Sequence, residues 1–118
     1  MMILIAGPYR SGTGDDPNKM EANVHAMEAY ALPIFRMGHI PVLGEWFALP
    51  LVKLTDSKAV GDAAFNEIFH PIAERLLEKC DAVLRVGGVS KGADLMVEVA
   101  RRNGVPVYTR LKDIPSEK

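Results

Sequence analysis

Two glycine-containing turns, each placed between an apolar run and a helix-like segment, constrain the fold of this chain more than any other feature. The first turn, GPYRSG at 7–12, follows the apolar run 2–6, and the second, GGVSKG at 87–92, follows the run 82–86. Short apolar runs of this kind are typical of strands covered on both faces, as in a parallel sheet. The carboxyl ends of parallel strands lie at one edge of the sheet, so we expect both turns to meet there.

Strand-like and helix-like segments alternate along the rest of the chain. Strands are predicted at 2–6, 39–43, 82–86 and 106–108, and helices at 17–37, 45–52 (a short helix or a lid), 62–79 and 92–103. Pro33 is expected to kink the first helix or to remove one of its hydrogen bonds. Pro71 is expected to divide the third helix, and Pro41 to place the second strand at an edge. This βα alternation predicts an α/β three-layer sandwich with a small parallel sheet, flavodoxin/Rossmann-like, in the strand order 2-1-3-4.

The composition of the chain fits one domain, residues 1–118, with a single core, because 48% of its 118 residues are apolar. The net charge is −1 and no run of Lys or Arg occurs, which argues against a nucleic-acid partner. The apolar opening, 1–6, is too short for a signal peptide or a membrane span, so we expect a cytoplasmic protein without a membrane partner. The three histidines are not spaced as metal ligands, and neither a metal nor a cofactor is expected.

The predicted strand order places the topological switch point between the first and third strands, so the two turns should line one crevice. Backbone N–H groups and helix N-termini at such an edge favour an anionic ligand. Arg10 lies in the first turn, and Arg85 is next to last in the third strand, where apolar residues are usual. Both guanidinium groups are therefore expected to bind phosphate. For Arg85, the alternative of an ion pair with a carboxylate such as Glu45 or Asp62 stays open.

Two acids and a histidine near this edge are candidates for acid–base chemistry. Glu45 follows the second strand, and Asp94 lies in the first turn of the last helix. Each has an ordinary alternative, because an acid in the first turn also stabilises the helix dipole. Trp46, beside Glu45, is expected to limit solvent access or to stack on a base. His70, next to Pro71, is a further candidate acid or base.

The ordered motifs of the chain resemble those of the nucleoside 2-deoxyribosyltransferase-like superfamily. The resemblance is carried by GPYRSG after the first strand, by the strand CDAVLRV, and by the turn SKGA, which leads into a helix that ends before VPVY. It covers nearly the whole chain. It implies a nucleoside or nucleotide ligand, with cleavage or transfer at the N-glycosidic bond, as in the small members that act on deoxynucleoside monophosphates. It also implies a homodimer or higher homo-oligomer, for which the apolar segment 46–54 is a candidate contact.

The two turns and the resemblance together supply the expected site residues. Substrate-binding residues are predicted in the first turn (Gly7, Tyr9, Arg10, Ser11 and Gly12), in the second turn (Gly87, Gly88, Ser90 and Gly92), and at Trp46, Arg85 and Met96. In the family, a glutamate early in the last helix attacks the sugar, and an aspartate on the preceding helix assists. The resemblance places these functions at Met96 and Ala73 here, and a thioether cannot replace a carboxylate nucleophile. Two interpretations follow: Glu45 or Asp94 takes the catalytic role, or the domain binds a nucleotide-like metabolite without turnover.

Overall fold

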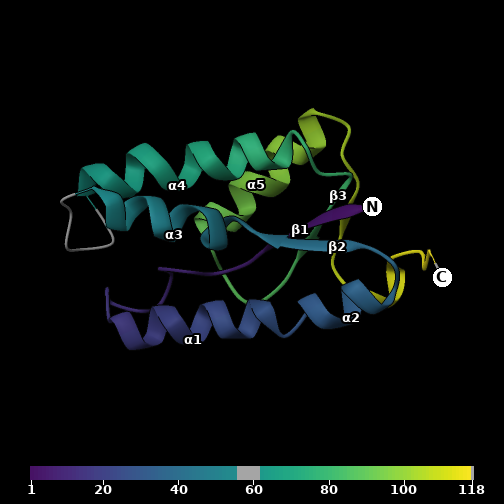
Figure 1. Ribbon diagram of the computed structural model, residues 1–118, viewed down its shortest axis with the longest axis horizontal. Helices are drawn as coiled ribbons and strands as arrows, with labels where there is room; N and C mark the ends of the chain where they lie inside the picture. Colours follow the sequence, from purple (N-terminus) through teal and green to yellow (C-terminus); the bar gives the residue numbers. More distant parts are fainter. Residues whose placement is uncertain (56–61, 118) are drawn as a thin grey trace.

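The sheet of this protein has the strand order that the sequence predicts (Figure 1). The computed structural model describes residues 1–55 and 62–117, and within these ranges it holds one sheet of four parallel strands. The strands are β1 (Met2–Ala6), β2 (Ile40–Leu43), β3 (Ala82–Arg85) and β4 (Val107–Tyr108). Their order, β2-β1-β3-β4, confirms the predicted 2-1-3-4 arrangement and places Pro41 on an edge strand.

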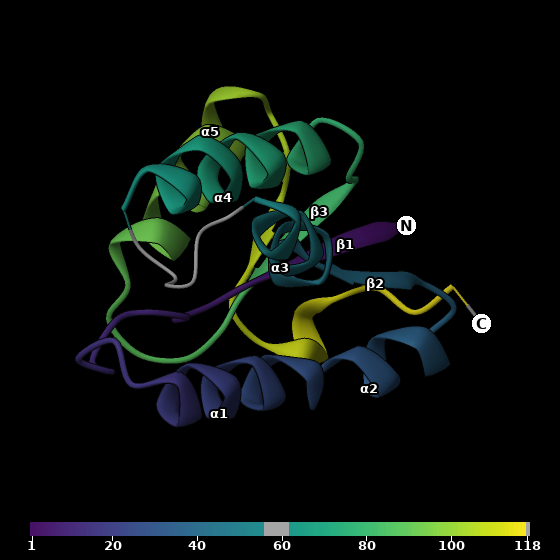
Figure 2. The same cartoon turned by 60° about the vertical axis from the view of Figure 1, so that its left-hand side comes forward.

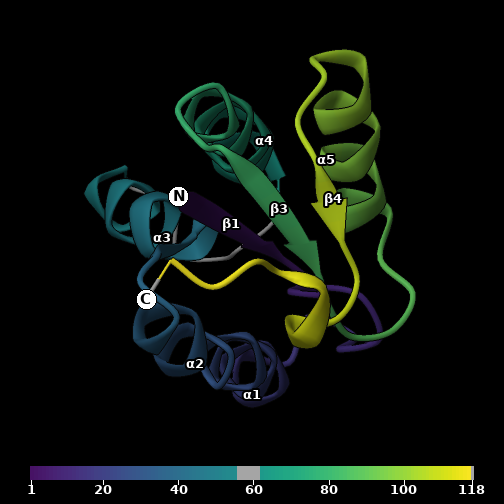
Figure 3. The ribbon, with the colours of Figure 1, turned by 90° about the vertical axis from the view of Figure 1, so that its right-hand side faces the viewer.

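Helices cover both faces of the sheet and make it the middle layer of a three-layer sandwich (Figure 3). One face carries α1 (Pro17–Glu28), α2 (Ala31–Arg36) and the short 3₁₀ helix η1 (Leu111–Asp113); the other carries α4 (Asp62–Leu77) and α5 (Lys91–Arg102). Ile3 and Ile5 of β1 pack with Met27 in one core. The alternate residue Leu4 packs with Leu77 in the other, so β1 is buried on both faces, as its wholly apolar sequence predicts.

The first predicted helix, 17–37, is two helices in the structure. α1 ends at Glu28 and α2 begins at Ala31, so the interruption lies a few residues before Pro33. Pro33 has no N–H to donate to the carbonyl of Ala29, and its ring would collide with that carbonyl in a continuous helix. The chain turns more tightly there instead, because the Tyr30 N–H donates to the Met27 carbonyl at 3.1 Å.

α4 runs without interruption from Asp62 to Leu77, so the predicted division of this helix at Pro71 is wrong. Pro71 removes one hydrogen bond, the one that its nitrogen would otherwise donate to the carbonyl of Glu67. The helix is held by its neighbours: α3 (Gly44–Leu54) packs along it (Figure 1), and its residues Phe69 and Leu77 are buried. Tertiary packing therefore outweighs the local cost of the proline.

The carboxyl ends of β1, β2 and β3 lie at the same edge of the sheet (Figure 2). β1 leads into the turn at 7–16, β2 continues into α3, and β3 leads through 86–90 into α5. Ser90 caps α5, because its Oγ accepts a hydrogen bond of 3.1 Å from the Ala93 N–H. The starts of α3 and α5 and the two glycine-containing turns therefore meet at this edge.

Candidate functional site

A cavity of about 470 Å³ lies at the carboxyl edge of the sheet, between the first turn and the starts of α3 and α5. The middle of α4 also lines the cavity, through Phe69, His70 and Ala73. Several of its lining side chains are apolar, including those of Leu4 and Met96. A volume of this size is in the range of pockets that bind small metabolites.

The cavity brings together some of the predicted site residues and leaves others outside. Residues of both turns line it: Gly7, Tyr9, Arg10 and Ser11 from the first, and Ser90 and Gly92 from the second, together with Glu45 and Met96. The predicted residues outside its lining are Gly12, Trp46, Arg85, Gly87, Gly88 and Asp94. The lining also holds residues that were not predicted from the sequence, among them Gly14, Asp15 and Phe69. The glycines around Asp15 were a signal that the turn extends beyond GPYRSG.

Arg10 and Asp15 form an ion pair within the first turn. The Arg10 guanidinium donates from Nη2 and Nε to the same oxygen of Asp15, Oδ1, at 2.9 and 3.2 Å. The backbone between them is closed by Thr13, whose hydroxyl donates to the Arg10 carbonyl at 2.6 Å and accepts from the Asp15 N–H at 3.2 Å. Thr13 is buried, so its two hydrogen bonds fix the conformation of this turn, in which Arg10 lines the cavity.

Tyr9 forms an aromatic wall of the cavity together with Phe69. The two rings stack, with centroids 5.1 Å apart and planes 18° apart. The backbone of Tyr9 is held by Asn23, whose Nδ2 donates to the Tyr9 carbonyl at 2.8 Å. Burial raises the pKa of the Tyr9 phenol, the Glu45 carboxylate raises it further, and Arg10 lowers it. The Tyr9 phenol therefore lies within electrostatic range of both charged groups.

Glu45 lies in the first turn of α3 and lines the cavity. Burial raises its pKa from the ordinary 4.5 to about 7, and a hydrogen bond from its own backbone N–H partly opposes this rise. The preceding residue, Gly44, lies against α4, since a Cβ built there would be 3.5 Å from the Cβ of Ala73. Near neutral pH both protonation states of Glu45 are populated, which is the property that a general acid or base needs.

Met96 and Ala73 both line the cavity, and Met96 is only 5% exposed. The resemblance places the family's nucleophilic glutamate and assisting aspartate at these two positions. The corresponding surface of this cavity is therefore apolar. Among the described residues that line it, the carboxylates belong to Glu45 and to Asp15, which is paired with Arg10.

Arg85 braces the turn between β3 and α5 and does not line the cavity. Its Nε donates to Asp94 Oδ1 at 3.2 Å, its Nη2 to the Gly88 carbonyl at 2.7 Å, and its Nη1 to the Val86 carbonyl. Its side chain is 14% exposed, whereas that of Asp94 is 67% exposed. The ion-pair alternative for Arg85 is thus the observed one, with Asp94 as the partner. Arg85 and Asp94 both lie outside the cavity that they were expected to line.

Replacing Arg85 with methionine should destabilise the fold without discriminating between ligands. The carbonyls of Val86 and Gly88 would lose a charged donor, for which we expect a loss of about 1–3 kcal/mol in the free energy of unfolding. Urea denaturation measures that loss, and calorimetric titration should show equal effects on a nucleoside and on its 5′-monophosphate. Arg110→Met, at an exposed arginine outside the cavity lining, is the control. A selective loss of monophosphate binding in Arg85→Met would contradict this structural role.

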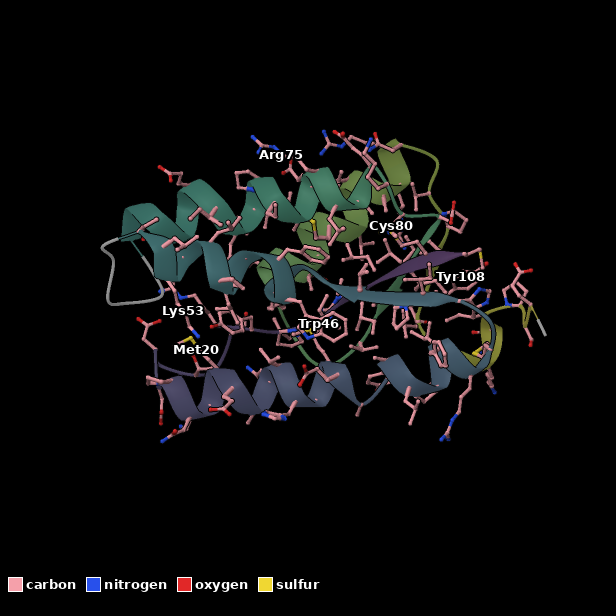
Figure 4. All side chains as sticks on the ribbon, viewed as in Figure 1. Met20, Trp46, Lys53, Arg75, Cys80 and Tyr108 are labelled. Carbon is pink, nitrogen blue, oxygen red and sulfur yellow. The ribbon has the colours of Figure 1, made fainter. Side chains whose placement is uncertain are left out.

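The remaining predicted residues lie outside the cavity lining. A Cβ built on Gly87 would lie 2.6 Å from the Cδ of Pro8, so the second turn packs directly on the first. Trp46 turns toward α1 (Figure 4), where its indole Nε1 donates to Glu28 Oε2 at 2.8 Å. Gly12 and Gly88 have open space where a Cβ would stand.

Comparisons of the chain with models of protein families, with curated proteins and with solved structures gave no match. The superfamily resemblance therefore stays a hypothesis, and the function is argued from the cavity. Within residues 1–55 and 62–117, no group of three or more His, Cys, Asp or Glu side chains is arranged to hold a metal ion. No helix in the same part of the chain combines the length and apolarity needed to cross a membrane.

Proposed function

We propose that this protein binds a nucleoside or a nucleotide in the cavity at the carboxyl edge of its sheet. The observation that carries the proposal is that both glycine-containing turns line one cavity of about 470 Å³, together with an aromatic pair and an arginine. Ligands of doubly wound α/β proteins bind at this edge. An aromatic wall suits a base, and a guanidinium with nearby helix N-termini suits an anionic group.

The cavity offers the ligand two kinds of surface, an aromatic one and a polar one. The base would pack against Tyr9, which is fixed by its stack on Phe69 and by the bond from Asn23. The sugar and any phosphate would face the polar groups of the first turn, Arg10 and Ser11, which line the same cavity. Recognition of the base would then depend on stacking, and recognition of the phosphate on charge.

Glu45 favours a second candidate function, cleavage of the N-glycosidic bond of that ligand. A carboxyl group with a pKa of about 7 is protonated often enough at neutral pH to act as a general acid. Glu45 would donate its proton to a nitrogen of the base while the bond between the base and the sugar C1′ breaks. The electron pair of that bond would leave with the base. Water would form the new bond to C1′, with its proton passing to His70, a second titratable group of the lining.

The apolar surface at Met96 separates this route from one with a covalent glycosyl intermediate. A thioether at that position cannot act as the carboxylate that would hold the sugar. Water is therefore the acceptor, and the products are the free base and the sugar or sugar phosphate. The alternative function, binding without turnover, uses the same cavity but leaves the N-glycosidic bond at C1′ intact.

The outer face of α3 bears on the expected self-association. Phe47, Leu51 and Leu54, all within the segment 46–54, are exposed large apolar side chains. A second copy of the chain remains our proposed partner for this segment. Measurement of molecular mass in solution over a range of concentrations tests it.

Nucleosides or their 5′-monophosphates should raise the thermal stability of the protein, and Tyr9→Leu should remove most of this gain. At a ligand concentration of 100 times Kd, the expected stabilisation is about 2.7 kcal/mol. Thermal unfolding with the four deoxynucleosides and their monophosphates measures it. Tyr9→Phe is the matched control, since it keeps the stack on Phe69 and removes only the hydroxyl. If no compound of this panel stabilises the protein, the proposed function is wrong.

A further inference from the structure

Asp15 holds the cationic group that an anionic ligand would use. We propose that the ligand carries a phosphate monoester, which binds Arg10 by displacing the carboxylate of Asp15. Asp15 is then a built-in competitor that sets the affinity for phosphorylated ligands. This inference rests on the proposed function, because it takes the cavity as the ligand site.

The ion pair engages Arg10 through a single oxygen of Asp15. Nε and Nη2 of Arg10 converge on that oxygen, Oδ1. Arg110 and Asp113 provide the contrast, because there Nε and Nη2 take separate oxygens, at 2.9 and 3.3 Å. The parallel arrangement is the one that guanidinium groups form with carboxylate and phosphate. A phosphate can offer Arg10 two oxygens where Asp15 offers one.

The exposure of the two partners shows which of them can leave. The side chain of Asp15 is 65% exposed, whereas that of Arg10 is 32% exposed. The carboxylate can therefore rotate into water and be solvated there. Exposed ion pairs contribute at most about 1 kcal/mol, and a phosphate dianion carries more charge than the carboxylate that it replaces. Exchange of one anion for the other is favourable on both grounds.

The backbone at Asp15 is held independently of the ion pair. Asp15 has a φ of 61° and follows Gly14, whose φ is 57°, so both residues are in the left-handed region. The Asp15 N–H is bound by the hydroxyl of Thr13, a buried side chain. Displacement thus requires a rotation of the Asp15 side chain and no rearrangement of the turn.

Arg10 is the side chain of the cavity that we expect to bind the phosphate. Arg10 is the arginine among the described lining residues, no lysine is among them, and the donors of Arg85 are taken by its own turn and by Asp94. The carboxylate of Glu45, at the start of α3, would repel a phosphate placed near it in the cavity. The phosphate is therefore assigned to Arg10, and the base and C1′ to the part of the cavity near Tyr9 and Glu45.

Asp15→Asn tests the inference. Asparagine keeps the shape of the side chain and tolerates the left-handed backbone, but it removes the competing charge. Calorimetric titration should show that the 5′-monophosphates bind about fivefold more tightly than to the wild type, while the matched nucleosides bind as before. Asp113→Asn, which breaks a similar Arg–Asp pair outside the cavity lining, should change neither affinity.

The outcomes separate this inference from the proposed function. If Asp15→Asn weakens or leaves unchanged the affinity for monophosphates that do bind, Asp15 positions Arg10 and does not compete, and the inference is overturned. Arg10→Gln should abolish the preference for monophosphates over nucleosides, and a retained preference also overturns it. Inorganic phosphate is titrated as a third probe. If it binds as tightly as the monophosphates, the cavity does not recognise the nucleoside, and the proposed function falls.

Discussion

Glu45→Gln should abolish release of the base and, in the same molecule, stabilise the fold above neutral pH. Glutamine has nearly the shape of glutamate but no proton to give to the leaving base, and loss of a general acid costs about 10²–10⁴-fold in rate. At high pH the wild type retains the half-buried carboxylate of Glu45, whereas the variant has no charge there. We expect the variant to be more stable by about 3 kcal/mol at pH 8.5. Chromatography of the released base and urea denaturation measure the two effects.

The pH at which the stabilisation appears follows from the sign of the pKa change. The pKa of Glu45 is raised from 4.5 to about 7 on folding, so between these values the folded state binds more protons than the unfolded state. The free energy of unfolding of the wild type therefore falls as pH rises from 4.5 to about 7. Glutamine removes this slope. The two proteins should have nearly equal stability at about pH 4, and the difference should be complete above about pH 7.

A control and a pH profile sharpen this test. Glu21→Gln removes an exposed carboxylate on α1, outside the cavity lining, and should leave base release unchanged. Base release by the wild type should decline above about pH 7, where Glu45 loses the proton that it must donate. If Glu45→Gln retains base release, Glu45 is not the acid. If wild type binds nucleosides but releases no base, the protein is the binding module without turnover.

The strand order could be predicted because its signals are local and strong. The wholly apolar β1 can be stable only when it is covered on both faces, which makes it central. Pro41 cannot donate to a neighbouring strand, which makes β2 an edge. With β1 central and β2 at an edge, the right-handed βα connections leave few other arrangements.

The two helix prolines show where local signals fail. Pro33 and Pro71 have the same effect on the backbone, yet the first accompanies a break between α1 and α2, whereas α4 continues through the second. The difference lies in tertiary packing, since α4 packs against α3 and is anchored by Leu77 in the core. Proline patterns alone do not contain that information.

The sequence predicts where the candidate site lies better than it predicts which side chains contact one another there. That both turns would approach one edge follows from strand direction. Which donors of Arg85 would be taken by the carbonyls of its own turn depends on side-chain rotamers, which the sequence does not specify. Asp15 was missed because it lies outside the GPYRSG motif and returns to Arg10 only through left-handed backbone at Gly14 and at Asp15 itself.

Gly87→Ala should be among the most damaging substitutions in the chain, because it separates the two turns that form the cavity. Gly87 has a φ of +77°, which an alanine adopts only at a cost of about 1–2 kcal/mol. Its new Cβ would lie 2.6 Å from the Cδ of Pro8, and relief of such a clash costs about 1–3 kcal/mol more. Urea denaturation should show a total loss of about 2–5 kcal/mol.

Gly88→Ala is the matched control for this prediction. The two glycines are adjacent, but no neighbouring atom lies within 4 Å of the place that a Cβ of residue 88 would take, and Gly88 has no positive φ. Its replacement should therefore change stability by less than about 0.5 kcal/mol. Because Pro8 lies between Gly7 and Tyr9 of the cavity lining, displacement of its ring in Gly87→Ala should also weaken nucleoside binding. Equal stability of the two variants would mean that the turns do not depend on one another, and the shared cavity would then lack the support that its function requires.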